Sequence, residues 1–375
     1  MSASAATATS RAARAALFAP AAVVVERRDD GVQILRSPVP LQDYPVRMGA
    51  WIEQWSEAEP DRAFLLERGG DGRWAGVTYG EAAQRMLRLA AGLQQRNLSP
   101  ERPLVILSDN SVEHALLMLA ALYVGIPVAP LSPAYSLQSK DFGKLRAIVT
   151  LLCPGMIYAG DKRRYEPALA AIRDLRDAEV VAGTESAAAL AGATPIAALY
   201  ALGGTGAVAR AAAEVTRDTI AKLLFTSGST GEPKAVINTH GMLCANQQAK
   251  AQTWPFLAND PPVIVDWLPW SHTFGGNHNF NMVLRNGGTL YIDRGKPMPG
   301  LFEATLANLR EIAPTVYFNV PRGYDMLIAA LRADAGLRER FFSRLRVLFY
   351  AGAALPQNLW DALGDLAQQA RRAGR

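Results

Sequence analysis

A loop of nine residues, rich in glycine and hydroxyl groups, lies between two short apolar segments and reads TSGSTGEPK over Thr226–Lys234. Glycines let a backbone turn sharply and direct its N–H groups toward a ligand. The hydroxyl groups add hydrogen-bond donors, and Lys234 adds a positive charge on a flexible stem. We therefore predict that this loop binds phosphate groups.

The loop differs from a Walker A sequence, G-x-x-x-x-G-K-[ST]. Glu232 and Pro233 stand between the last glycine and Lys234, and neither Ser nor Thr follows the lysine. The next segment, Ala235–Asn238, is typical of a strand, whereas a Walker A loop opens a helix. A P-loop NTPase is thus a distant alternative, and a hydroxyl-rich surface hairpin with no ligand is another.

The elements that must position this loop alternate between strand and helix patterns. Such alternation favours a doubly wound, largely parallel α/β sheet. The strand candidates are Trp74–Thr78, Pro103–Leu107, Ile126–Pro130, Met156–Ala159, Leu223–Phe225, Ala235–Asn238, Val263–Trp267, Thr289–Ile292, Thr315–Phe318 and Val347–Tyr350. The helix candidates are Val46–Ser56, Tyr79–Asn97, Val112–Val124, Phe142–Leu152, Met242–Thr253, Gly275–Leu284, Leu301–Ile312, Arg322–Leu331 and Asn358–Arg372.

The length of 375 residues exceeds what one hydrophobic core usually supports. The Ala- and Gly-rich stretch Ser186–Ala213 is expected to link two α/β units. We expect a disordered tail over residues 1–25, a first α/β subdomain over 26–200, and a second over 201–375 that carries the phosphate loop.

The composition excludes several classes of protein. The formal net charge is +5, but the basic residues are scattered and form no stripe with aromatics, so we expect no nucleic-acid partner. No apolar run is long enough to span a membrane. The two cysteines and four histidines lack metal-ligand spacing. The cysteines fit reduced thiols in a cytoplasmic protein.

Five segments, in matching order, resemble the adenylate-forming superfamily, which includes acyl-CoA synthetases, luciferases and peptide-synthetase adenylation domains. They are the phosphate loop, Val77–Tyr79 with Glu81, Leu119–Ser132 (LAALYVGIPVAPLS), Leu268–Gly276 (LPWSHTFGG) and Phe349–Pro356 (FYAGAALP). The last block has Ala351 where the family commonly has Ser. The resemblance covers nearly the whole chain and implies the two doubly wound subdomains of the family's N-terminal domain, without its C-terminal part.

Within the superfamily, three segments look most like feruloyl-CoA synthetases. They read RSPVPLQDYP, SPAYSLQSKDFGKLR and LPWSHTFGGNHNFNMVLRNGGTLYIDRGKP. The resemblance implies an acid–CoA ligase that adenylates a hydroxycinnamic acid with ATP and Mg²⁺ and then transfers the acyl group to coenzyme A. Another acyl-CoA synthetase, such as a fatty-acid ligase, is an alternative.

The resemblance also implies roles for individual residues. Lys234 is expected against the phosphates, and Thr226 at a phosphate and its Mg²⁺. His272 is expected beside the acyl carboxylate, with Phe274 and Gly276 near the substrate. The remaining nucleotide-binding candidates are Ser227, Gly228, Ser229, Thr230 and Gly231 in the loop, and Gly352, Ala353 and Ala354 beside adenine. The aromatic residues Trp267, Trp270, Phe274 and Phe280 are candidates to line an acyl pocket.

The family's later motifs do not appear in this sequence. Missing are the G-x-T-E segment with its Mg²⁺-binding Glu, the T-G-D segment, the hinge and the C-terminal lysine that drives adenylation. We therefore expect an N-terminal portion of an acid–CoA ligase that is inactive on its own. The alternative from another class is a non-catalytic protein that binds a nucleotide or an acyl group.

Overall fold

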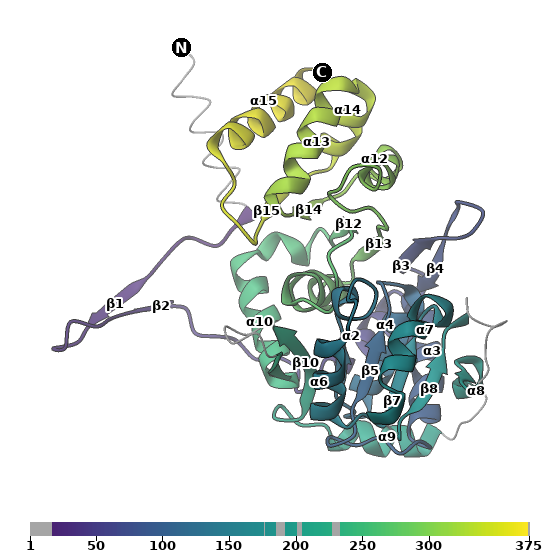
Figure 1. The fold of residues 1–375 in the computed structure, drawn as a ribbon. Helices are drawn as coiled ribbons and strands as arrows, with labels where there is room; N and C mark the ends of the chain where they lie inside the picture. The colour runs from purple at the N-terminus through teal and green to yellow at the C-terminus, as the bar shows by residue number, and fades with distance from the viewer. Residues whose placement is uncertain (1–16, 176, 185–191, 201–204, 227–232, 374–375) are drawn as a thin grey trace, which may run out of the picture.

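The computed structural model describes residues 17–175, 177–184, 192–200, 205–226 and 233–373 (Figure 1). Its strands are β1 Val24–Arg27, β2 Gln33–Arg36, β3 Ala63–Arg68, β4 Trp74–Thr78, β5 Leu104–Leu107, β6 Val128–Pro130, β7 Met156–Ala159, β8 Glu179–Ala182, β9 Thr194–Pro195, β10 Ile220–Thr226, β11 Lys234–Thr239, β12 Val263–Asp266, β13 Thr289–Ile292, β14 Val316–Asn319 and β15 Val347–Tyr350.

The α-helices are α2 Gly49–Ala58, α3 Tyr79–Leu93, α4 Val112–Tyr123, α5 Pro133–Ser136, α6 Gly143–Leu152, α7 Lys162–Ala171, α8 Ala197–Tyr200, α9 Thr205–Glu214, α10 His240–Thr253, α11 Asn281–Arg285, α12 Phe302–Glu311, α13 Pro321–Ala333, α14 Ala335–Ser343 and α15 Gln357–Ala373. The other helical elements of the described residues are two short 3₁₀ turns, η1 Arg173–Leu175 and η3 Pro255–Ala258, and a π-helix, η4 Phe274–Phe280.

Two large sheets form the body of the protein. A seven-stranded sheet has the order β11-β10-β6-β5-β7-β8-β9, and its strands are parallel except for the antiparallel pair β10–β11. A four-stranded sheet has the order β12-β13-β3-β4, with β4 antiparallel. The predicted α/β class with largely parallel sheets is confirmed. Both sheets contain strands from each side of residue 200, and the division into subdomains there stays a prediction.

Strand β5 shows how the layers of the protein are built. Successive side chains of a strand point to opposite faces of the sheet. Leu104 and Ile106 enter the main core, which also takes in α2, α3, α4, α10 and α11, whereas Val105 and Leu107 enter a second core beneath α6 and α7. The seven-stranded sheet is therefore covered by helices on both faces, which explains why β5 is apolar throughout.

The same alternation builds a third core on the far side of the molecule. In β14, Val316 and Phe318 face the main core, while Tyr317 packs with helices α12 to α15. Strands β14 and β15 form a parallel pair next to β12, and these helices make the upper lobe in Figure 1. The order of layers is thus helices, sheet, helices, sheet, helices.

Local capping interactions fix the ends of two core helices. Thr78 begins α3 with a capping box: its side chain accepts from the N–H of Glu81, whose carboxylate accepts from the N–H of Thr78. After α4, Gly125 adopts a φ of +76°, and the N–H of Ile126 bonds back to the carbonyl of Ala121. This reversal sends the chain directly into β6.

The structure describes residues 17–25 of the expected tail over residues 1–25. Residues 1–16 lie outside the described part of the chain, but Phe18 packs edge-on against Trp254 and Phe256. Strands β1 and β2 then form an antiparallel hairpin that projects away from the body (Figure 1). The turn between them has Gly31 at a φ of +84°, a conformation that suits glycine.

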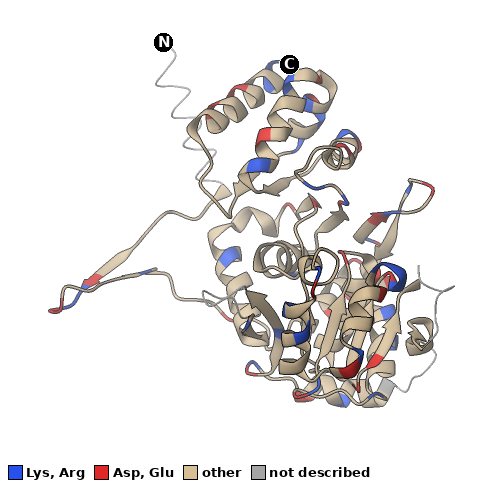
Figure 2. Cartoon of the chain, viewed as in Figure 1, with Lys and Arg blue, Asp and Glu red and all other residues tan. Residues whose placement is uncertain are grey.

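Charged side chains are spread over the whole chain. Figure 2 shows basic and acidic residues interspersed on both lobes, which agrees with the scattered basic residues of the sequence. No helix among the described residues combines the length and the apolarity needed to cross a membrane.

The left-handed conformation of Gly125 gives a direct test of the α4–β6 connection. We expect Gly125→Ala to reduce the free energy of unfolding by about 1 kcal/mol or slightly more, because an L-residue is strained at that φ. Urea denaturation measures the change. The control is Gly70→Ala, where a Cβ meets no atom within 4 Å. Equal stability of the two variants would contradict the assignment of strain to Gly125.

Candidate functional site

The phosphate loop joins the antiparallel strands β10 and β11. Thr226 and Lys234 are paired across the ladder as the last and first residues of these strands, and both side chains are exposed. The two are therefore neighbours at the mouth of the hairpin. The predicted loop residues Ser227, Gly228, Ser229, Thr230 and Gly231 lie outside the described residues.

The register of the sheet places this hairpin next to other polar residues. Lys222 of β10 pairs with Val128 of the parallel strand β6. Thr226 comes four residues after Lys222, and Ser132 comes four residues after Val128. Neighbouring strands are about 4.8 Å apart, so Thr226 and Ser132 share one edge of the sheet. This is the carboxyl edge, where open α/β sheets bind their ligands.

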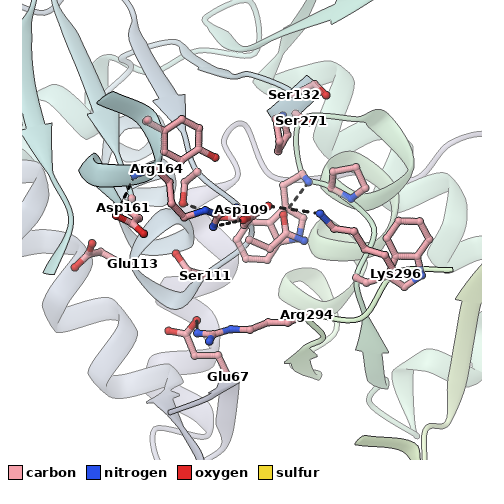
Figure 3. Close-up of a pocket in the computed structure, with 18 of the residues that line it drawn as sticks. Glu67, Asp109, Ser111, Glu113, Ser132, Asp161, Arg164, Ser271, Arg294 and Lys296 are labelled. Atoms are coloured by element: carbon pink, nitrogen blue, oxygen red, sulfur yellow. Dashed lines mark hydrogen bonds and ion pairs between the residues drawn. The ribbon is translucent and has the colours of Figure 1, made fainter. Parts of the chain in front are cut away.

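A cleft of about 710 Å³ opens at that edge (Figure 3). Ser132 lines it, together with the segments that follow β5, β7 and β8 of the seven-stranded sheet. The opposite wall comes from Glu67 near the end of β3 and from the segments after β12 and β13. The carboxyl edges of both large sheets therefore face one cleft.

Ion pairs lie within and between the two walls of the cleft, and the pair Asp109–Lys296 connects the walls. Asp109, after β5, binds Arg164 of α7 at 2.9 Å and lies 4.0 Å from Lys296, which follows β13. Arg294 lies 4.0 Å from Glu67 (Figure 3). The cleft thus presents charges of both signs rather than a purely cationic surface.

Asn110 anchors the second predicted site segment. Its side-chain amide donates to the carbonyl of Leu268 at 2.9 Å, and its carbonyl oxygen accepts from the N–H of Trp270 at 3.0 Å. These two bonds hold the backbone of the LPWSHTFGG block against the end of β5. Sequence reasoning missed this residue, although a polar Ser-Asp-Asn-Ser run directly after a buried strand is typical of a functional edge.

The predicted helix Gly275–Leu284 is only partly correct. Residues Phe274–Phe280 form a π-helix, and α11 follows it. The π-helix lies directly on the preceding backbone: a Cβ at Gly275 would be 2.3 Å from the carbonyl oxygen of Leu268, and one at Gly276 would be 2.4 Å from that of Trp270. Such close approach requires glycine at both positions. π-Helical turns are rare and frequent at functional sites.

His272 lies at the start of this turn, with an exposed side chain. Its Nδ1 accepts a hydrogen bond from the N–H of Phe274 at 3.2 Å. A neutral histidine whose Nδ1 accepts carries its proton on Nε2. The ring therefore has a donor on its other side.

An aromatic cluster connects the π-helix to β15. The ring of His278 stacks on Phe349 at 5.0 Å and meets Phe318 edge-on at 5.2 Å. Burial lowers the pKa of His278 to about 4, so this ring is neutral at pH 7. Phe274 packs within the same cluster, and Gly352 follows β15 with a φ of +90°. The exposed Gly352, Ala353 and Ala354 thus begin where the cluster ends.

The four aromatic candidates for an acyl pocket divide into two groups. Trp267 is half-buried and lines the cleft. Trp270, Phe274 and Phe280 are buried in the main core, where Phe280 packs edge-on against Trp270, although Trp270 also borders the cleft. Among the candidates, Trp267 is therefore the one whose side chain is partly open at the cleft.

Two buried carboxylates stand at the ends of β12 and β13. Asp266 accepts from the N–H of Leu268 and from the amide of Asn279, and burial raises its pKa to about 7. Burial also raises the pKa of Asp293, which accepts from Thr305 and two other donors. Asp266 thus ties the start of the LPWSHTFGG block to the π-helix. Within the described residues no cluster of His, Cys, Asp and Glu could hold a metal ion.

Hydrogen bonds bring three of the predicted blocks together. Lys222 of β10 donates to the carbonyl of Gly276 at 3.3 Å, and Asn238 of β11 accepts from the amide of Asn277 at 3.0 Å. Both strands that carry the phosphate loop are therefore bonded to the π-helix that follows His272. The π-helix in turn contacts β15 through His278 and Phe349.

The carboxyl edge of a mostly parallel, layered α/β fold is a common place for ligand binding. A model of the AMP-binding enzyme family matches residues 52–372. The chain belongs to this family.

Relatives include a carboxylic acid reductase from Mycobacterium tuberculosis (strain ATCC 25618 / H37Rv), 29% identical over 71% of this chain and 23% of its own length. A feruloyl-CoA synthase from an Amycolatopsis species is 27% identical over 83% of this chain and 55% of its own length. The chain thus spans less than two thirds of either relative. A solved luciferase-like enzyme from the mealworm Zophobas morio has the same fold, with a TM-score of 0.69 and 18% identity over 92% of this chain and 73% of that one.

The buried Asp266 predicts a pH dependence of stability. Its folded-state pKa of about 7 exceeds the value near 3.9 expected in an unfolded chain, so the folded state holds the extra proton between those pH values. The contribution of Asp266 to stability is therefore lost as the pH rises from about 4 to about 7. We expect Asp266→Asn to lose less stability than the wild type over this range.

Urea denaturation at a series of pH values measures this difference. The control is Asp365→Asn, because Asp365 is exposed on α15. Parallel stability curves for the wild type and Asp266→Asn would show that Asp266 is already ionised throughout the range.

The contact of the π-helix with the backbone below it gives a second prediction. We expect Gly276→Ala to destabilise the protein by about 1–3 kcal/mol, since its Cβ would overlap the carbonyl oxygen of Trp270. Urea denaturation measures the loss, and Gly364→Ala on the exposed face of α15 is the control. If Gly276→Ala is as stable as the wild type, the π-helix has space for a Cβ at this position and the prediction is wrong.

Proposed function

We propose that this chain provides the ATP- and acyl-binding site of an acid–CoA ligase that activates a carboxylic acid as its acyl-adenylate. The acid we propose is ferulate or a related hydroxycinnamate. The observation that carries the proposal is that one π-helix is bonded to both strands that carry the phosphate loop, follows His272 directly, and stacks on β15, which leads into the small-residue turn. Such a site can hold phosphates, an acyl carboxylate and an adenine side by side.

The adenylation step needs charge neutralisation more than proton transfer. A carboxylic acid has a pKa near 4 and is ionised at pH 7. One carboxylate oxygen attacks the α-phosphorus of ATP, the bond between that phosphorus and the bridging oxygen breaks, and pyrophosphate leaves. Lys234 lies exposed at the mouth of the hairpin, where its ammonium would stabilise the negative charge on the phosphates.

His272 would orient the acid. With Nδ1 occupied by the N–H of Phe274, its Nε2–H is the donor that faces outward. A donor at this position binds a carboxylate or a phosphate oxygen without taking up a proton. In the second half-reaction, the thiolate of coenzyme A attacks the acyl carbonyl carbon and AMP leaves.

The described residues supply little of a magnesium site. Mg²⁺ is usually held by one or two carboxylates, the substrate's phosphates and water. Thr226 offers a hydroxyl at the end of β10, and the described part of the chain has no carboxylate cluster that fits such an ion.

Support for an aromatic acid comes from two directions. The half-buried Trp267 lines the cleft, so a planar ring would meet aromatic surface there. A feruloyl-CoA synthase is also among the relatives that match most of this chain. The carboxylic acid reductase is the reason to test other acids as well.

The substitution Lys234→Ala tests the phosphate site. We expect it to weaken ATP binding by about tenfold or more, because it removes the cation at the loop's end. Isothermal titration calorimetry measures the affinity. The control is Lys144→Ala, which removes an exposed lysine on α6. Unchanged ATP binding by Lys234→Ala would contradict the role of this residue.

The acid is tested by binding and by trapping. We expect feruloyl sulfamoyl-adenosine, a stable analogue of the acyl-adenylate, to bind more tightly than the octanoyl analogue. Hydroxylamine trapping with ferulate, coumarate, caffeate and octanoate provides the matching activity assay. A preference for octanoate would reject the hydroxycinnamate proposal, and ATP hydrolysis without any acid would favour a P-loop type of activity.

A further inference from the structure

Three consecutive carbonyl groups of the π-helix accept hydrogen bonds from side chains. The carbonyl of Gly276 accepts from Lys222 Nζ at 3.3 Å. The carbonyl of Asn277 accepts from Gln247 Nε2 at 2.8 Å, and that of His278 from Lys250 Nζ at 2.9 Å. Side-chain donors thus bind three successive peptide groups of the π-helix.

These donors come from β10, which precedes the phosphate loop, and from α10, which follows the second strand of the hairpin. Lys222 lies on β10, four residues before Thr226. Gln247 and Lys250 lie on α10, which begins at His240 directly after β11. Hydrogen bonds therefore link the π-helix that starts beside His272 both to the strand before the phosphate loop and to the helix after the hairpin.

Both lysines are held in surroundings that disfavour a charge. Lys222 is fully buried and Lys250 is 9% exposed, and burial lowers the pKa of each to about 7. Among the described residues, the ion pairs include no carboxylate partner for either ammonium group. Apolar side chains of similar length would fill the same space without this desolvation cost.

The titratable groups that face these lysines do not compensate for the cost, and Lys222 Nζ lies 5.9 Å from the centre of the Phe280 ring, at the outer limit of a cation–π contact. His114 and His240 face Lys222, and His278 faces Lys250. Burial lowers the pKa of each of these histidines to about 4, so they are neutral at pH 7. Core stability therefore does not explain lysine at either position, whereas a donor aimed at a π-helix carbonyl does.

We propose that Lys222 and Lys250, together with Gln247, are positioning residues that fix the His272 turn relative to the phosphate hairpin. This inference rests on the proposed function. The three donors set the distance between the group that binds the acyl carboxylate and the group that binds the phosphates. A ligand that spans both halves of the site depends on this distance, while AMP, which lacks the acyl half, depends on it much less.

The substitutions Lys222→Met and Lys250→Met separate positioning from stability. Methionine matches the length and the apolar stem of lysine but donates no hydrogen bond. We expect each variant to be as stable as the wild type or more stable, because a buried amine is removed. We also expect about a tenfold or greater loss of affinity for feruloyl sulfamoyl-adenosine, with AMP affinity changed less than about threefold.

Urea denaturation and calorimetry with the two ligands give these three quantities on the full chain. The matched control is Lys162→Met, since Lys162 is also buried but binds Glu166 on its own helix, α7. Lys250→Arg keeps a donor near the carbonyl of His278 and is expected to recover part of the lost affinity. If Lys222→Met does not fold, Lys250→Met and Gln247→Leu decide the question.

The outcomes separate the inference from the proposed function. Failure of the wild type to bind feruloyl sulfamoyl-adenosine would overturn the proposed function. If the wild type binds the analogue and the methionine variants bind it equally well, the positioning role is wrong. Equal losses for AMP and the analogue in a destabilised variant would show a purely structural role and would also overturn the inference.

Discussion

Contact between two stretches of backbone governs the geometry of the candidate site. The π-helix Phe274–Phe280 rests on the carbonyl groups of Leu268–Trp270, and this approach leaves no space for a Cβ at Gly275 or Gly276. The side chain of Asn110 bonds the backbone of Leu268 and Trp270 to the end of β5. The position of His272 is thus set by main-chain packing, which would have to shift if a Cβ were added at either glycine.

The layers of the fold place the contact between the π-helix and Leu268–Trp270 beside the carboxyl ends of the parallel strands. Parallel strands end together, so the segments after β5, β6, β7, β12 and β13 meet along one cleft. Helices cover both faces of the seven-stranded sheet and leave its carboxyl edge open. The charged residues Asp109, Arg164 and Lys296 then join the two walls across that edge. Core packing therefore provides rigidity, and the polar segments beyond the strands provide chemistry.

Strong local patterns predicted much of this fold, and contacts between distant segments decided the rest. Met156–Ala159 is a strand with the predicted bounds because a short apolar run has few alternatives. The hairpin β1–β2 was missed, although an Asp-Gly pair, Asp30-Gly31, between the valines of β1 and the Ile-Leu of β2 is a hairpin signal. The π-helix could not be predicted, because it depends on packing against Leu268. Nor does a lysine in β10 reveal that its side chain points inward; charged residues are seldom buried without an ionic partner.

The distribution of the tryptophans makes the cleft accessible to optical measurement. Of the seven indole rings in the sequence, that of Trp360 is the strongly exposed one, and Trp267 and Trp270 line the cleft. Trp267 also donates from its indole nitrogen to the side chain of Asn319 at 3.3 Å. A bound ring or anion would change the polarity around these two chromophores and leave the distant Trp360 unaffected. Intrinsic fluorescence of the protein therefore contains a built-in signal of cleft occupancy, readable without any added label.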